Sequence, residues 1–205
     1  MNEKNIIIVA RILSVIFTPF YLPLVGLIAL FLFSNLSYYP FLAKIFVLTL
    51  VYLFTVLLPT LLIRAYRNYH GWTPIEFGAK EKRIIPYVIS IICYFSCFYF
   101  MKRMHIPHFM GTILIAALFI QIVCAIINIH WKISTHSAAI GGVAGAIMAF
   151  SHIFIFNPSW WLSVVVIMGG VVGTSRMILR QHTLAQVIVG FIVGTICAFM
   201  AIIYM

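Results

Sequence analysis

Residues 109–129 read FMGTILIAALFIQIVCAIINI, a run without a single charged side chain. An α-helix of this length covers about 30 Å, which is the thickness of the hydrocarbon core of a bilayer. Six further apolar runs accompany it, at roughly 6–33, 42–63, 84–101, 138–156, 160–174 and 183–204. The sequence therefore predicts an all-α, polytopic membrane helix bundle of six to seven spans, with the runs at 84–101 and 160–174 the shortest.

The overall composition agrees with a lipid environment. Of the 205 residues, 64% are hydrophobic and 8% are charged, and the mean hydropathy is +1.16. A soluble fold of this size could not bury so much apolar surface. We expect one integrated membrane domain, made of N-terminal spans and a basic loop over 1–79 and a core over 80–205. It should be a multi-pass protein of a bacterial inner membrane.

Prolines and glycines within the apolar runs predict two further features of the helix bundle. Pro19 and Pro23 predict a kink in the first span. Three small-xxx-small pairs lie in the last three spans and predict close helix packing there: Gly141 with Gly145, Gly169 with Gly173, and Gly190 with Gly194.

The charged residues limit the possible chemistry. Thirteen Lys and Arg face three acidic residues, and there is no Asp in the chain. Hydrolysis by a carboxylate pair needs two positioned acids, and magnesium-dependent phosphoryl transfer needs carboxylates to hold the ion. We therefore expect no metal or other cofactor, an anionic substrate, and chemistry carried out by His, Ser, Lys and Arg.

Two short segments on the same side of the bundle carry such residues. In the first, HWKISTHS at 130–137, Ser134 and Thr135 are natural helix N-caps, and His136 follows in the first helical turn, where an anion could bind. In the second, TSRMILRQH at 174–182, Arg176 offers a planar fork suited to phosphate. His182 is followed four residues later by Gln186, whose amide could orient its ring.

Together, the two segments resemble the second and third motifs of the type 2 phosphatidic acid phosphatase superfamily, PSGH and SRxxxxxHxxxD. Ser134 and His136 match the second motif, and Ser175, Arg176 and His182 match the third. The resemblance extends from about residue 80 to the end of the chain. It implies that His182 is the nucleophile that forms a phosphohistidine, that His136 is the general acid, and that Ser134 and Arg176 bind phosphate.

The chain departs from the family pattern in two places. Gln186 stands where the family has the Asp that orients the nucleophile, and a neutral amide adds no charge to stabilise an imidazolium. The first motif, KxxxxxxRP, is absent. By position in the basic stretch before Pro86, Arg83 and then Lys80 are the candidates to replace its cations.

The resemblance implies a metal-independent membrane phosphatase that hydrolyses a phosphomonoester or pyrophosphate of a lipid. The expected partners are that phosphorylated lipid and the bilayer, with no nucleic acid and no obligate protein partner. A lipid phosphotransferase, a non-catalytic phospholipid-binding relative and an anion transporter stay as alternatives. The membrane side of the site is open, because the excess of Lys and Arg indicates the cytoplasm and the resemblance implies the outer side.

Overall fold

The structure is a computed structural model that describes residues 3–33, 39–72 and 84–204, and all elements in these ranges are helices. In chain order they are α1 (Glu3–Ile16), the 3₁₀ turn η1 (Pro19–Tyr21), α2 (Leu22–Phe33), α3 (Phe41–Tyr52), the π-helical turn η3 (Leu53–Leu57), α4 (Leu58–Tyr69), α6 (Ile84–Arg103), α7 (His108–His130), α8 (Thr135–Phe154), α9 (Ser159–Ile178) and α10 (Leu184–Ile203). Seven helical segments in the described ranges are long and apolar enough to cross a membrane. The all-α membrane bundle is confirmed.

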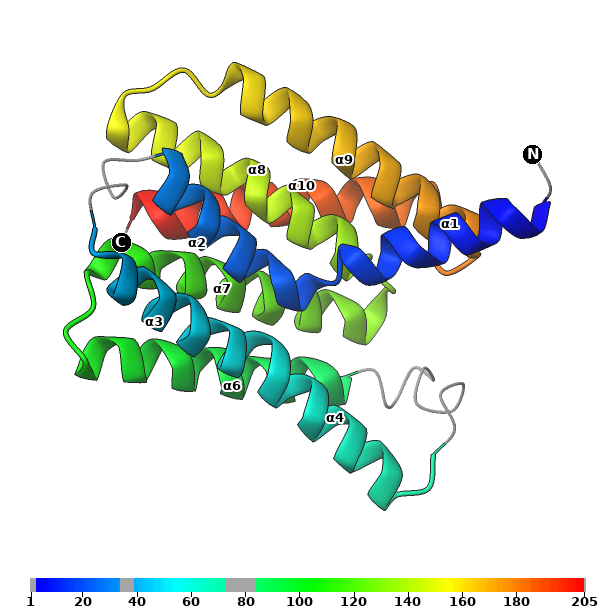
Figure 1. Ribbon diagram of the computed structural model, residues 1–205. Coiled ribbons are helices and arrows are strands. Elements are labelled where there is room, and N and C mark those ends of the chain that lie inside the picture. Colours follow the sequence, from blue (N-terminus) through cyan, green and yellow to red (C-terminus); the bar gives the residue numbers. More distant parts are fainter. Residues whose placement is uncertain (1–2, 34–38, 73–83, 205) are drawn as a thin grey trace.

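The first span is broken where the prolines predicted a kink. Helix α1 ends at Ile16, and η1 starts with Pro19 before α2 resumes at Leu22. Proline has no backbone N–H to continue the helical ladder, which explains the break. As a result, α1 diverges from α2 and packs against α9 (Figure 1).

The sixth span is longer than the sequence predicted. The predicted run ended at 174, whereas α9 continues to Ile178, so Arg176 lies in the last helical turn and not in a loop. The helix ends in a Schellman-type turn: Gln181 N–H donates to the Arg176 carbonyl, and Arg180 has a left-handed φ of 52°. The charged side chain of Arg176 is held in this apolar span by its hydrogen bond to the hydroxyl of Ser14 in α1.

Among the described helices, α8 and α10 are the most closely packed pair, as the small-residue pairs predicted (Figure 1). The glycines of both helices let the two backbones touch. A Cβ on Gly190 would lie 2.7 Å from the carbonyl oxygen of Ser134, and one on Gly194 would collide with the carbonyl of Ala138. This contact fixes the start of α8 against the first turns of α10.

The elements that carry the two sequence motifs meet at one end of the bundle. Figure 1 shows the start of α8, the end of α9 and the start of α10 at the same end as α1 and the end of α4. Helix α7 packs on α6, α8 and α10, while α2 lies over α7 and α8. The predicted sharing of one membrane side by the two motif segments is confirmed.

Candidate active site

Two hydrogen bonds join the predicted motif segments to each other. The backbone N–H of Ser134 donates to the carbonyl of Gln186 at 3.4 Å. The Lys132 ammonium donates to the carbonyl of Gln181 at 2.6 Å. The segment before α8 and the loop before α10 therefore form one surface, although almost fifty residues of chain separate them.

The side chain of Gln186 orients the ring of His182. Nδ1 of His182 lies 3.1 Å from Oε1 of Gln186, and the same oxygen accepts the backbone N–H of Thr183 at 3.2 Å. A backbone N–H can only donate, so the amide oxygen and not the nitrogen must face it. Nδ1 of a neutral His182 therefore carries the proton, and Nε2 is its acceptor nitrogen.

This contact arises from helix capping and not from two residues on one helical face. Thr183 is the N-cap of α10, and its hydroxyl accepts the N–H of Gln186 while Gln186 returns a bond to the Thr183 backbone. His182 thus lies just before the N-cap of α10. The capping box therefore places the amide oxygen of Gln186 within hydrogen-bond distance of His182 Nδ1.

Ser134 has the capping role that its sequence position indicated. Its side chain is fully buried, it accepts the N–H of Ser137, and its hydroxyl lies 2.9 Å from that of Ser137. The first turn of α8 that follows holds His136. Ser134 therefore orders the backbone of the site, and its hydroxyl is hydrogen-bonded to the hydroxyl of Ser137.

Ser14 of α1 joins two of the predicted site residues and was not predicted from the sequence. The Arg176 guanidinium donates through Nη1 to the hydroxyl of Ser14, whose side chain is buried. Nε2 of His136 lies 3.2 Å from the carbonyl oxygen of Ser14, so this nitrogen carries a proton. The only local signal was that Ser14 is the single polar residue in the run ILSVIF at 12–17.

Two buried nitrogen atoms beside Ser14 have no hydrogen-bond partner within the described residues. They are Nδ1 of His136 and Nε of Arg176. Buried polar groups are nearly always satisfied in folded proteins, so an unpaired guanidinium nitrogen next to an unpaired imidazole nitrogen suggests that an anion belongs there. A phosphate oxygen can accept from Nε of Arg176, and it can accept from Nδ1 of His136 when that ring carries a second proton.

His182 also lines a cavity of about 270 Å³ at this end of the bundle. The polar groups in its wall come from three helices and from the segment between α7 and α8, and they include Ser90, Gln121, Asn128, Thr135 and Lys132. His136 and Arg176 do not line it, because they turn toward Ser14 of α1. Gln121, Asn128 and Ser90 were hidden from sequence reasoning inside apolar runs, although each is a polar residue in a predicted span.

The two cations that were expected to replace the missing first motif, Lys80 and Arg83, lie outside the described residues. Their part in the site stays a prediction. The described part of the site is therefore His182 with Gln186, His136 with Arg176 and Ser14, and the capping residue Ser134.

The fold and this site define a helical integral membrane protein with histidines and an arginine gathered at one membrane face. Residues 129–205 match the family model of the PAP2 superfamily. Over these residues the match confirms the resemblance to the type 2 phosphatidic acid phosphatase superfamily that the motifs predicted. It covers α8, α9 and α10 and supports a phosphatase-type activity in general. No curated protein and no solved structure matches the chain.

Proposed function

We propose that the protein is a membrane phosphatase that hydrolyses a phosphomonoester or pyrophosphate of a lipid through a phosphohistidine on His182, without a metal ion. The observation that carries this proposal is the contact of His182 Nδ1 with the Gln186 oxygen at 3.1 Å. It holds the neutral ring in the tautomer whose Nε2 has a lone pair for attack on phosphorus. The cavity that His182 lines offers a place for the phosphate.

Arg176 and His136 supply the charge and the proton in this proposal. Arg176 does not line the cavity of His182 while it is bonded to Ser14, so in this proposal the incoming phosphate replaces the Ser14 hydroxyl as its acceptor and also accepts from Nε. His136 keeps its Nε2 proton on the Ser14 carbonyl, so in this proposal the proton given to the substrate is a second one, carried by Nδ1 in the imidazolium form. Fixed donors of this kind stabilise the charge that develops on the transferring phosphoryl group.

The reaction has two steps. In the first, Nε2 of His182 bonds to phosphorus while the bond from phosphorus to the lipid oxygen breaks, and this oxygen takes the Nδ1 proton of His136. In the second, water attacks phosphorus, the bond to His182 breaks, and His136 takes the proton of the water. The products are the dephosphorylated lipid and inorganic phosphate, and both histidines return to their starting states.

Phosphate release from a panel of lipids tests the proposal. The panel holds phosphatidic acid, a polyprenyl diphosphate and a phosphorylated glycolipid, each presented to purified protein in detergent. Wild type should release phosphate with and without a metal chelator, and His182→Ala should release none. His152→Ala changes an exposed histidine at the far end of α8 and serves as the control that keeps activity. Equal release by wild type and His182→Ala would contradict the proposal.

Gln186 favours one alternative function. An amide cannot share a full negative charge with the imidazolium that phosphorylation creates, so the chain could bind phospholipid without turnover. This alternative predicts that inorganic phosphate and lipid phosphate bind at Arg176 while no phosphohistidine forms. Binding without release across the whole panel would establish it.

A further inference from the structure

The end of α1 carries one residue that accepts hydrogen bonds from both His136 and Arg176. The carbonyl oxygen of Ser14 lies 3.2 Å from Nε2 of His136, and the Ser14 hydroxyl accepts from Nη1 of Arg176. Among the described side chains of α1, only Ala10 and Ser14 are buried, and they lie one turn apart on the same face. Helix α1 packs against α9, the helix of Arg176, so this narrow face is the part of α1 that the bundle covers.

The Ser14 carbonyl is available to His136 because α1 breaks before Pro19. In an uninterrupted helix this carbonyl would accept the N–H of Thr18. Here Thr18 is extended, with φ −62° and ψ 137°, as expected for a residue that precedes proline. Its N–H donates to the Val15 carbonyl at 3.4 Å, and its hydroxyl donates to the same carbonyl at 2.7 Å and lies 3.5 Å from that of Ser14. A carbonyl oxygen has two lone pairs, so the oxygen of Ser14 can accept from the imidazole as well.

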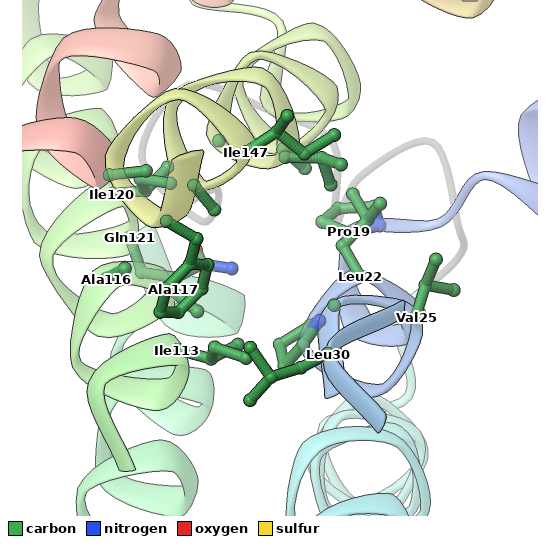
Figure 2. A pocket seen from close by; sticks show the side chains of 18 of the residues that line it. Pro19, Leu22, Val25, Leu30, Ile113, Ala116, Ala117, Ile120, Gln121 and Ile147 are labelled. Atoms are coloured by element: carbon green, nitrogen blue, oxygen red, sulfur yellow. The ribbon is translucent and has the colours of Figure 1, made fainter. Parts of the chain in front are cut away.

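Pro19 is fixed in the walls of two cavities, so the break stays at one place beside the site. Pro19 lines the cavity of His182 and also a second, apolar cavity of about 160 Å³ between α2, α7 and α8. Figure 2 shows Pro19 above Leu22 at the start of α2, across the apolar cavity from Gln121 of α7. Packing on both cavities restricts where α1 departs from α2, and therefore where the end of α1 lies.

We propose that Ser14 is a positioning residue for the general acid, and that the break at Pro19 makes its carbonyl available for this role. Because the carbonyl accepts the Nε2 proton of His136, Nδ1 is the nitrogen that exchanges a proton with the substrate. Nδ1 gives its proton to the lipid oxygen as the bond from that oxygen to phosphorus breaks, and the ring is left neutral with its Nε2 proton on Ser14. This inference rests on the proposed function. Ser14 and Pro19 lie outside the 129–205 region that matches the family.

The two histidines of the site are held in opposite tautomers by different segments. Gln186, in the capping box of α10, accepts from Nδ1 of His182. Ser14, at the end of α1, accepts from Nε2 of His136. A change in α1 should therefore alter the tautomer of His136 and leave that of His182 as it is.

Histidine tautomers can be measured by ¹⁵N NMR of protein labelled at the ring nitrogens, at an alkaline pH where the rings are neutral. The two signals are assigned by their loss in His136→Asn and His182→Asn. Wild type should show the Nε2–H tautomer at His136 and the Nδ1–H tautomer at His182. Pro19→Ala lifts the restraint on the preceding residue and lets the helix continue, so His136 should become a mixture of tautomers. Pro23→Ala, in the first turn of α2 and beyond the break, is the control that should change neither histidine.

Ala10→Leu is a second variant that leaves the proline in place. Ala10 is 2% exposed, so a leucine there would overpack and move α1, with Ser14, away from α9. The tautomer of His136 should change as it does in Pro19→Ala. Val9→Leu, at an exposed neighbouring position, is the matched control. An unchanged tautomer of His136 in both variants would overturn the proposal, and so would an equal change at both histidines.

Two substrates with different leaving groups test what the contact does for the reaction. A long-chain alkyl phosphate needs a proton on its leaving oxygen, whereas a nitrophenyl phosphate releases a stable phenolate and needs little help from an acid. Pro19→Ala should lower kcat/KM about tenfold or more on the alkyl phosphate and change it less than about twofold on the nitrophenyl phosphate. An equal loss on both would overturn the positioning role and leave the phosphatase standing. No hydrolysis of either by wild type, with the tautomers as expected, would overturn the phosphatase and leave the contact of Ser14 with His136 standing.

Discussion

The amide oxygen of Gln186 is shared between Nδ1 of His182, at 3.1 Å, and the backbone N–H of Thr183, at 3.2 Å. The second contact determines which end of the amide faces the ring, because only the oxygen can accept from a backbone N–H. A glutamine thus sets the tautomer of His182 at the position where the superfamily motif has an aspartate. It does so without adding a negative charge.

Substitution of Gln186 separates orientation from charge. Gln186→Glu keeps an oxygen within reach of both donors and adds a charge, so it should speed phosphohistidine formation about tenfold, as expected for a charge-assisted hydrogen bond. Gln186→Leu removes the acceptor and should slow it about 10²-fold or more. Single-turnover kinetics with a labelled lipid phosphate measures both. A leucine variant as fast as wild type would show that the ring needs no orienting partner.

Arg176 should act through its planar fork and not through charge alone. Arg176→Lys keeps the charge but loses the second nitrogen, the Nε that has no partner. Since hydrogen bonds to charged groups are the stronger ones, KM should rise about tenfold or more. Arg180→Lys, at an exposed residue in the turn after α9, is the matched control. Equal KM values for the two variants would argue that Arg176 does not touch the phosphate.

Ser14 competes with phosphate for Arg176 in this account. Ser14→Ala removes the hydroxyl that accepts from the guanidinium and keeps the backbone carbonyl that holds His136. Inorganic phosphate should then inhibit at about threefold to tenfold lower concentration, because one protein hydrogen bond no longer has to be broken. Product inhibition assays measure this shift. Weaker inhibition would instead make Ser14 a positioning residue for Arg176.

Gly190 should be essential for the contact of α10 with the start of α8. A Cβ there would lie 2.7 Å from the Ser134 carbonyl, so Gly190→Ala should cost about 1–3 kcal/mol of stability through overpacking. At Gly170 no atom lies within 4 Å of an added Cβ, so Gly170→Ala should leave stability unchanged or raise it slightly. Thermal unfolding in detergent compares them. A Tm for Gly190→Ala at or above that of Gly170→Ala would contradict the packing described.

The bundle could be predicted from the sequence because span length and small-residue spacing are local signals. The uncharged run at 109–129 and the glycine pairs of α8 and α10 predicted the helices and their closest contact. The end of α9 could not be placed in the same way. The hydropathy pattern places Arg176 in a loop, whereas the structure places it in the last turn of α9, where Ser14 of α1 accepts a hydrogen bond from it.

The site could be predicted only where a motif carried it. His136, Arg176 and His182 belong to the two motif segments that the structure brings to one end of the bundle. Ser14 reaches them from a helix more than a hundred residues away in sequence, and no local pattern encodes that contact. Gln121 and Asn128 lie within a span, and the sequence alone does not show that they line the cavity of His182.

The central claim is that His182 carries the phosphoryl group. The direct test is to quench a reaction of the purified protein with a labelled lipid phosphate in base, where phosphohistidine survives, and to map the modified residue by mass spectrometry. The account predicts a phosphorylated peptide containing His182 in wild type, in larger amount in Gln186→Glu, and none in His182→Ala. Phosphate release by wild type with no modification at His182, or with the label on another residue, would contradict it.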